Sequence, residues 1–268
     1  MDDYRVVDLS QNDMTAYLHC LKTWDNCFHS ERKLKWYNKK AKRGLCVKVV
    51  KDDSDNVLGM IQYLPAEESF VEGKDIYLIQ CIWIHGYEKG PGDVQGRGLG
   101  KLLLEAVEKD VKGKGAGGLA AWGMSFEGWM PVSWYIKQGY TEVDRDGMRV
   151  LVWKRFCSTV SKPKFIKPKK TPDVMKGKVL VSVFNDGWCQ DPNIECDLTE
   201  KIVNEYGDEV VYKEYDTSDK EVLREWGIDN AILVDGEWLS FGPHSVDKQL
   251  RTLIKEKLKK IKDNTGEG

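Results

Sequence analysis

The chain has 268 residues, and its composition of 41% hydrophobic and 31% charged residues is that of an ordinary globular protein with room for two domains. Its formal net charge of −2 argues against nucleic acid or an acidic membrane as a partner, and no apolar run is long enough to span a bilayer. Because the first residues lack the basic and apolar regions of a secretory signal, the sequence predicts a cytoplasmic protein.

The first part of the chain predicts short strands and amphipathic helices. Ser10 and Asp13 make an N-terminal capping pair for one helix, and a second helix is expected to begin at Ser30. Alternating apolar and polar residues on either side of the turn sequence 52–56 predict a hairpin. The strands expected in this part are residues 4–9, 45–51 and 57–64.

A strand, a glycine-rich loop and a helix follow. Residues 76–84 are apolar and rich in β-branched side chains, as expected of a buried strand, and an amphipathic helix begins near Leu99. The loop glycines allow the backbone to approach a bulky anion, and the N–H groups at the helix start point to the same place. Arg97 and Lys101 add positive side chains to this anion-binding pattern.

Other interpretations of the loop compete with this one. A nucleoside-triphosphate loop needs a hydroxyl after Gly-Lys, whereas Leu102 follows Gly100 and Lys101, so that interpretation fails. A dinucleotide loop follows the first strand of a parallel βαβ series, whereas this loop follows the fourth strand of an expected meander. A purely structural glycine turn stays open as the alternative.

The order Gln95-Gly96-Arg97-Gly98-Leu99-Gly100 matches Gln/Arg-x-x-Gly-x-Gly/Ala, and the first domain therefore resembles the GNAT N-acetyltransferases, whose corresponding loop holds the pyrophosphate of acetyl-CoA. The segment 134–140 resembles the closing Tyr-x-x-x-Gly-Phe of that family. The resemblance covers roughly residues 1–156 and implies an α/β (α+β) fold, with a mixed central sheet and flanking helices. The later elements expected in this domain are a strand at 119–124, a helix at 130–138 and a hairpin of 141–145 with 149–154.

The resemblance also implies acetyl-CoA as co-substrate and an amine as acceptor, whose identity stays open. Tyr135 matches the family tyrosine that protonates the leaving thiolate, with a merely packed tyrosine as the alternative. Glu127 and His85 are candidate proton acceptors, with a solvated carboxylate and a loop histidine as the alternatives. The expected acetyl-CoA contacts are the strand residues Ile82, Trp83 and Ile84 and the loop residues Gln95, Gly96, Arg97, Gly98, Leu99, Gly100 and Lys101.

Two further features of this domain bear on the acceptor. The connection 85–94 is longer than is usual in the family, and it forms either a flap beside the site or a surface insertion. Aromatic residues occupy the positions that build the acceptor pocket in the family, which indicates a small acceptor with an apolar or cationic portion, or else ordinary core packing. These positions are Trp24, Phe28, His29, Trp36, Trp129 and Trp134.

Residues 157–177 alternate lysines with prolines and are expected to be an inter-domain linker, with a basic arm for nucleic acid as the alternative. Residues 178–268 predict the order βαβαββα and resemble a smaller thioredoxin-like domain of the YoaP-like type. Its first helix is expected to begin at Asp191-Pro192, and a capping box from Ser218 to Glu221 should start the second.

The cysteines bear on the function of this second domain. Seven cysteines without a short repeated spacing favour reduced thiols over a disulfide framework. Cys189 follows the first strand, but Cys196 comes seven residues later, where a dithiol motif needs two intervening residues. The resemblance of the first domain implies an acetyl-CoA-dependent N-acetyltransferase, and the alternative is a CoA-binding protein that uses its second domain to bind thiols or exchange disulfides.

Overall fold

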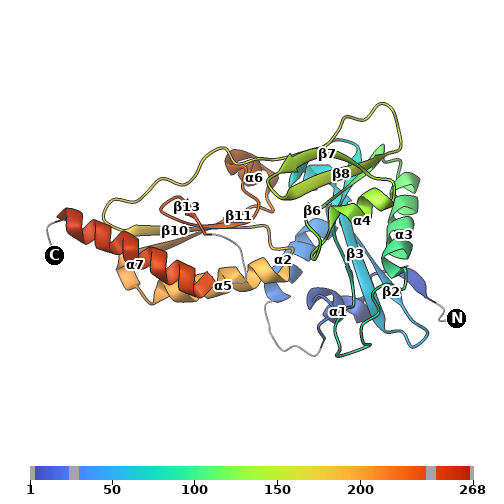
Figure 1. The fold of residues 1–268 in the computed structure, drawn as a ribbon, viewed down its shortest axis with the longest axis horizontal. Coiled ribbons are helices and arrows are strands. Elements are labelled where there is room, and N and C mark those ends of the chain that lie inside the picture. Colours follow the sequence, from blue (N-terminus) through green and yellow to red (C-terminus); the bar gives the residue numbers. More distant parts are fainter. Residues whose placement is uncertain (1–3, 24–29, 240–245, 266–268) are drawn as a thin grey trace. The chain divides into compact units, whose positions relative to one another are not determined.

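The computed structural model describes residues 4–23, 30–239 and 246–265, and it contains two compact units, Met1–Ile166 and Lys167–Gly268 (Figure 1). Within those described ranges, no helix combines the length and the apolar character that crossing a bilayer requires. Each unit has its own sheet and its own hydrophobic core.

The first unit is built on a mixed seven-stranded sheet with the order β1-β2-β3-β5-β6-β8-β7. Strands β5 and β6 are parallel, and every other neighbouring pair is antiparallel. The strands are β1 (Arg5–Asp8), β2 (Cys46–Lys51), β3 (Val57–Pro65), β5 (Ile76–Ile84), β6 (Gly118–Met124), β7 (Thr141–Asp146) and β8 (Arg149–Arg155). The helices are α1 (Met14–Leu18), α2 (Ser30–Ala41), α3 (Leu99–Gly113) and α4 (Val132–Lys137), with the short 3-10 helices η1 (Gln11–Asp13) and η2 (Ala66–Glu68). This order and the mixed α/β fold class confirm the prediction.

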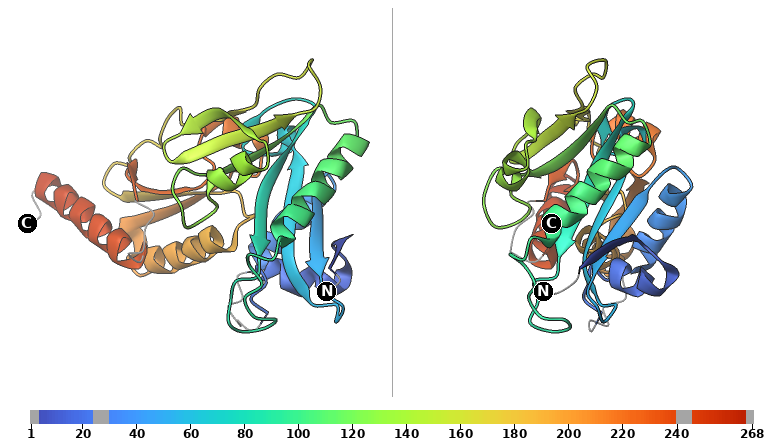
Figure 2. Two further views of the ribbon diagram at one scale, coloured as in Figure 1. Left: turned by 45° about the vertical axis from the view of Figure 1, so that its right-hand side comes forward. Right: turned by 90° about the vertical axis from the view of Figure 1, so that its right-hand side faces the viewer.

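The two faces of this sheet carry different helices. Helix α3 lies across β2, β3 and β5 (Figure 2) and buries its apolar face, including Leu103 and Val107, against Ile61 and Tyr63. Because side chains alternate along a strand, Gln62 points to the opposite face, where the hydroxyl of Tyr17 in α1 donates to it. Helices α1 and α3 therefore cover opposite faces.

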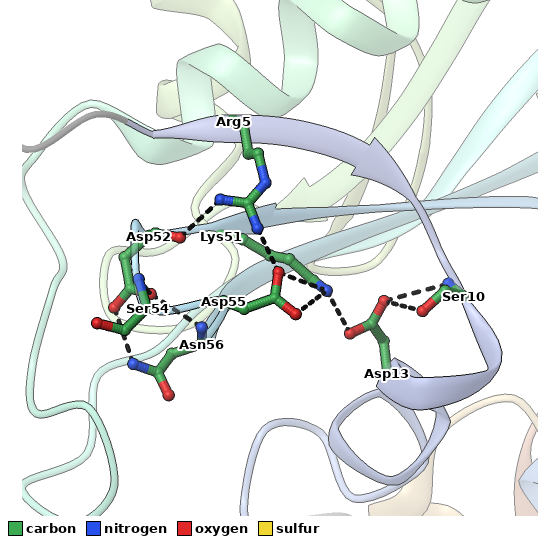
Figure 3. A network of polar contacts seen from close by, with 8 residues as sticks. All are labelled: Arg5, Ser10, Asp13, Lys51, Asp52, Ser54, Asp55 and Asn56. Atoms are coloured by element: carbon green, nitrogen blue, oxygen red, sulfur yellow. Dashed lines mark hydrogen bonds and ion pairs between the residues drawn. The ribbon is translucent and has the colours of Figure 1, made fainter.

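The start of the chain is fastened to the β2–β3 hairpin by a polar network (Figure 3). The ammonium of Lys51 lies 2.7 Å from the carboxylate of Asp13, and both side chains are buried. Asp55 in the hairpin turn pairs with Lys51 and with Arg5 of β1. The side chain of Asp13 also accepts from Ser10, which confirms the predicted capping pair.

Strands β5 and β6 pair only from Ile76 to Ile79, opposite Gly118 to Ala121. Beyond that point β5 pairs with β3 alone, and the ladder between β3 and β5 is interrupted at Gln80. The indole of Trp122 donates a hydrogen bond of 2.9 Å to the main-chain oxygen of Gln80. The parallel pair thus opens at a defined residue, and the glycine-rich loop follows the end of β5 that β6 leaves unpaired.

The segment 157–177 differs from the expected linker. It contains the strand β9 (Lys164–Phe165), which pairs with β4 (Val71–Glu72), a pair that the sequence did not predict. Phe165 and Ile166 are two apolar residues within the run of lysines and prolines. Both are buried in the first unit, as expected of apolar side chains. Residues 167–177 belong to the second unit, where the N–H of Lys169 donates to the carbonyl of Trp226.

The second unit has a four-stranded sheet in the order β11-β10-β12-β13, with β10 and β11 parallel and the other pairs antiparallel. Its elements follow the expected order βαβαββα. They are β10 (Val179–Asn185), α5 (Gln190–Asn204), η3 (Gly207–Glu209), β11 (Val210–Asp216), α6 (Lys220–Trp226), β12 (Ala231–Val234), β13 (Glu237–Trp238) and α7 (Val246–Thr265).

Two helix starts in this unit differ from the prediction. The cap of α5 is Cys189 and the helix begins at Gln190, each two residues before the expected cap Asp191 and first helical residue Pro192. The cap of α6 is Asp219, whose carboxylate accepts from the N–H of Glu221, rather than Ser218. Ser218 is unsuited because its hydroxyl already bonds to Asp216, the last residue of β11.

Candidate functional site

A cavity of about 580 Å³ lies at the open end of β5 in the first unit. It is lined by the end of that strand, by the glycine-rich loop with the first residues of α3, and by the segment that leads into α4. The lining residues are Ile82, Trp83, Ile84, Gln95, Gly96, Gly98, Leu99, Gly100, Lys101, Gly128, Met130, Pro131, Trp134, Tyr135 and Gln138. All the predicted acetyl-CoA contacts except Arg97 are among them.

The loop backbone is shaped for a close approach by a ligand. Gly96 and Gly98 have φ angles of 76° and 81°, in the left-handed region that favours glycine. A Cβ at either position would meet no other atom within 4 Å, so the space beside both glycines is open. Gly98 is also the N-cap of α3, and the first N–H groups of any helix lack intrahelical acceptors. An anion held there would receive N–H donors and the favourable end of the helix dipole.

The two loop cations lie in different places. Lys101 lines the cavity, and its ammonium is 3.8 Å from Glu105 on an exposed face of α3. The guanidinium of Arg97 instead reaches the hydroxyl of Tyr4 at 3.4 Å and lines a separate cavity of about 260 Å³ beside Asp52. Of these two loop cations, Lys101 lines the cavity and Arg97 does not.

Gln95 ties the loop to the strand. Its amide nitrogen donates a hydrogen bond of 3.1 Å to the main-chain oxygen of Ile84. The absence of a side chain at Gly86 makes room for this contact, since a Cβ there would fall 2.3 Å from the same nitrogen. The end of β5 and the start of the loop are thus held together on one side of the cavity.

His85 is buried outside the cavity lining. Its Nδ1 is 2.8 Å from the carbonyl of Gly92, and its main chain bonds to Leu58 and Val94. These bonds fasten both ends of the connection 85–94 to the sheet and to each other. The side chain fits a structural histidine in a packed connection.

Tyr135 combines burial with a hydroxyl that has no partner. Its ring packs against Trp134 and Tyr140, with ring centroids 4.9 and 5.6 Å away. The hydroxyl is fully buried and makes no hydrogen bond within the described part of the chain. Burial, followed by the nearby Cys81 thiol, raises the pKa of Tyr135 well above its ordinary value. The phenol therefore stays protonated at neutral pH.

Glu127 lies on the exposed segment before Gly128, and its carboxylate accepts a hydrogen bond of 2.8 Å from Ser133. It does not line the cavity, although its neighbour Gly128 does. Any contact between this carboxylate and a reacting group would pass through water.

The aromatic residues expected around an acceptor are dispersed. Trp134 lines the cavity, Trp36 is buried, and Trp129 is partly exposed with its ring 5.8 Å from that of Trp122. Trp24, Phe28 and His29 lie outside the described residues. The sequence analysis did not identify Met130, Pro131 and Gln138 as part of the cavity wall. The available signal was Pro131, a proline directly before a short apolar helix.

Comparison with known proteins identifies the domain type. Residues 8–125 match the sequence profile of the family described as the acetyltransferase (GNAT) family. No curated protein matches the chain.

Solved structures with a similar chain course include the GNAT family N-acetyltransferase YhbS from Escherichia coli in complex with CoA. It is 14% identical with a TM-score of 0.44, over 62% of this chain and 91% of that one. The PaiA N-acetyltransferase from Thermoplasma acidophilum in complex with coenzyme A is 15% identical with a TM-score of 0.43, over 57% and 99%. A GNAT family acetyltransferase from Brucella melitensis in complex with acetyl-CoA is 16% identical with a TM-score of 0.39, over 60% and 96%. At these low TM-scores the assignment of the domain rests on the family match.

Proposed function

We propose that the first unit, which matches the acetyltransferase (GNAT) family over residues 8–125, transfers the acetyl group of acetyl-CoA to the nitrogen of an amine. The observation that carries this proposal is the cavity itself. The open glycine loop, the end of β5 that β6 leaves unpaired and the side chain of Tyr135 all line it. They combine an anion-binding backbone, strand edges for an extended ligand and a proton source.

The residues present fit acetyl-CoA. The backbone of Gly96, Gly98 and Gly100 with the first turn of α3 would hold the pyrophosphate, assisted by the ammonium of Lys101. The main-chain groups of Ile82 to Ile84 that β6 leaves unpaired would bond to the pantetheine arm. The bound co-substrate would supply an acetyl thioester, which is reactive toward a neutral amine.

Tyr135 would act on the leaving sulfur. The hydroxyl holds its proton at neutral pH and would donate it when the carbon–sulfur bond breaks. Its ring is fixed between two other aromatic rings, so that little reorientation is needed. We assign to Tyr135 the role of general acid.

The acceptor must lose a proton before or as it attacks. A lysine-like amine has a pKa of about 10.4, so making it neutral at pH 7 costs roughly 4.6 kcal/mol, and close positioning can offset more than that. Glu127 can accept the proton through water from its exposed position. His85 is a weaker candidate, because its ring is buried against Gly92 and does not line the cavity.

For the second unit we propose a thioredoxin-like domain that contributes to substrate recognition. The support for this is its element order and its sheet, in which β10 is central, parallel to β11 and antiparallel to β12. Its cysteines give no support to a redox activity, as argued below.

The release of free CoA from acetyl-CoA in the presence of a panel of amines tests the proposed function. We expect release that depends on both the amine and the enzyme, and an acetylated amine detectable by mass spectrometry. If the folded protein binds acetyl-CoA but releases no CoA thiol with any amine, the unit binds the co-substrate without transferring its acetyl group, and the proposal is overturned.

A further inference from the structure

The segment between β6 and α4 turns back onto an edge of β6. The carbonyl of Met130 accepts a hydrogen bond of 2.8 Å from the N–H of Met124, and Met124 also pairs with Pro131 in an isolated parallel bridge. The next N–H along, that of Ser125, donates to the carbonyl of Met148 in the turn between β7 and β8. Because successive N–H groups of a strand point to opposite edges, Met130 and Pro131 lie on the edge of β6 that β5 occupies earlier in the strand.

Two features of the backbone belong to this return of the chain. Gly123 carries no side chain, and a Cβ there would fall 2.6 Å from the carbonyl oxygen of Met130. Met130 itself has a φ of 44°, in the left-handed region that residues with a Cβ rarely adopt. A glycine would adopt this φ without strain, so a methionine is present here despite the strained backbone. Strain of this kind clusters at functional sites, which makes the side chain of Met130 a candidate for a function.

Met130 also lines the cavity, as do Ile82 and Trp83 at the end of β5. The cavity walls thus include residues from both sides of the opening between β5 and β6. Trp134, another lining residue, lies beside the glycine loop, where a Cβ on Gly100 would meet its ring at 3.3 Å. One cavity therefore extends from the glycine loop to the opening between the two strands, and Met130 belongs to the second of these ends.

The proposed function gives the two ends different tasks. With the pyrophosphate at the glycine loop and the pantetheine arm along β5, the acyl group at the far end of the arm would lie in the opening, beside Met130. The walls there are apolar, and an unbranched methionine suits an irregular apolar space. Removing a methionine side chain beyond its Cβ frees roughly the space of three carbon atoms, and a butyryl group exceeds an acetyl group by two methylene groups.

We propose that Met130 closes the acyl end of the cavity and restricts the co-substrate to short acyl groups, so that acetyl-CoA is preferred over butyryl-CoA. This inference rests on the proposed function, because it specifies which acyl group the same site takes. Met130 is a specificity residue, and the proton transfers stay with the groups described above.

Calorimetry with acetyl-CoA and with butyryl-CoA, in the absence of any amine, tests the inference. In an apolar pocket, a single methylene group changes discrimination by about 10- to 200-fold. We expect wild type to bind acetyl-CoA at least tenfold more tightly than butyryl-CoA. In Met130→Ala the ratio of the two Kd values should fall to about one, because the deleted atoms leave room for the longer acyl chain.

A second variant and a control keep the test independent of folding. Met130→Gly removes the same side chain and relieves the backbone strain, so it should fold and also bring the Kd ratio to about one. Met148→Ala makes a matched substitution at a side chain that is 61% exposed and does not line the cavity, and it should keep the wild-type ratio. Binding of butyryl-CoA by wild type as tightly as acetyl-CoA, or an unchanged ratio in folded Met130→Gly, overturns the inference.

The release of CoA with the amine panel separates this inference from the proposed function, since calorimetry requires no transfer. A preference for acetyl-CoA that disappears in Met130→Gly, without CoA release from any amine, would contradict the proposed function and support the inference. Amine-dependent CoA release with equal binding of the two acyl-CoA compounds by wild type would do the reverse.

Discussion

The hydroxyl of Tyr135 has a proposed chemical task and, among the described residues, no structural one. Its ring fills space between Trp134 and Tyr140, but the hydroxyl makes no hydrogen bond within the described chain. A phenylalanine would pack equally well at this position. The oxygen is thus available to act on a bound ligand.

Replacing Tyr135 with phenylalanine should therefore lower kcat by about tenfold or more, with little change in acetyl-CoA affinity, since the proton is needed only when the thiolate leaves. Steady-state kinetics and calorimetry measure the two quantities. Tyr140→Phe is the matched control, because the hydroxyl of Tyr140 bonds to Glu108 and Tyr140 does not line the cavity. Wild-type turnover in Tyr135→Phe would make Tyr135 a packing residue.

Among the elements, the glycine loop and α3 were predictable because local chemistry determines them. Glycines at positive φ, a helix start and an apolar stripe all lie within a short stretch of sequence. The same holds for β5, whose observed bounds, Ile76–Ile84, coincide with the prediction. Such features depend little on the rest of the fold.

Other features depend on residues that are distant in the sequence, and the sequence alone did not indicate them. Arg97 turns toward Tyr4, and Gln95 toward the end of β5, because those partners happen to be close in space. The β4–β9 pair joins residues almost a hundred positions apart. The bulge at Gln80 is set by the register between β3 and β5, which no local pattern reveals.

At the point where β6 no longer pairs with β5, the indole of Trp122 donates a hydrogen bond to the carbonyl of Gln80. We expect this bond to stabilise the opening between the two strands. Trp122→Phe keeps an aromatic ring but leaves that buried carbonyl unsatisfied, which costs about 1–3 kcal/mol. We expect urea unfolding to show a loss of this order, with acetyl-CoA affinity close to wild type. A variant as stable as the wild type would show that the bond does not stabilise the opening.

At the scale of the whole molecule, the second unit lacks the geometry for dithiol chemistry. Cys189 is the N-cap of α5 and Cys196 is buried within the same helix. Seven residues of helix rise about 10 Å, whereas a disulfide needs Cα atoms within about 7 Å. We expect the protein to be inactive in an insulin-reduction assay. Turnover that disappears in Cys189→Ser would contradict this.

The same unit contains a buried acid whose titration should couple to folding. Burial, followed by the charge of Asp229, raises the pKa of Asp186 from 3.8 to about 8. At a pH between these two values the unfolded chain has lost this proton, whereas the folded chain keeps it. The stability contributed by the protonated Asp186 is therefore fully present below about pH 4 and is lost as the pH rises through about 8.

Denaturant unfolding at pH 5 and pH 8 should therefore show wild type losing more stability than Asp186→Asn, by on the order of 1–3 kcal/mol, since one pKa unit corresponds to about 1.4 kcal/mol. Asp208→Asn, on the exposed helix η3, is the control and should follow the wild type. Equal pH dependence in wild type and Asp186→Asn would mean that Asp186 is already ionised in the folded protein.

The affinity for acetyl-CoA measured by calorimetry with Gly98→Val, beside the matched variant Gly115→Val, tests most directly whether the cavity holds the co-substrate. Gly98 and Gly115 flank opposite ends of α3, have φ angles of 81° and 77°, and both face open space. The two variants therefore share the same backbone strain, and only Gly98→Val places a side chain where the pyrophosphate would lie. We predict that binding is lost in folded Gly98→Val and stays near wild type in Gly115→Val. Unchanged affinity in folded Gly98→Val would contradict the assignment of this loop to acetyl-CoA.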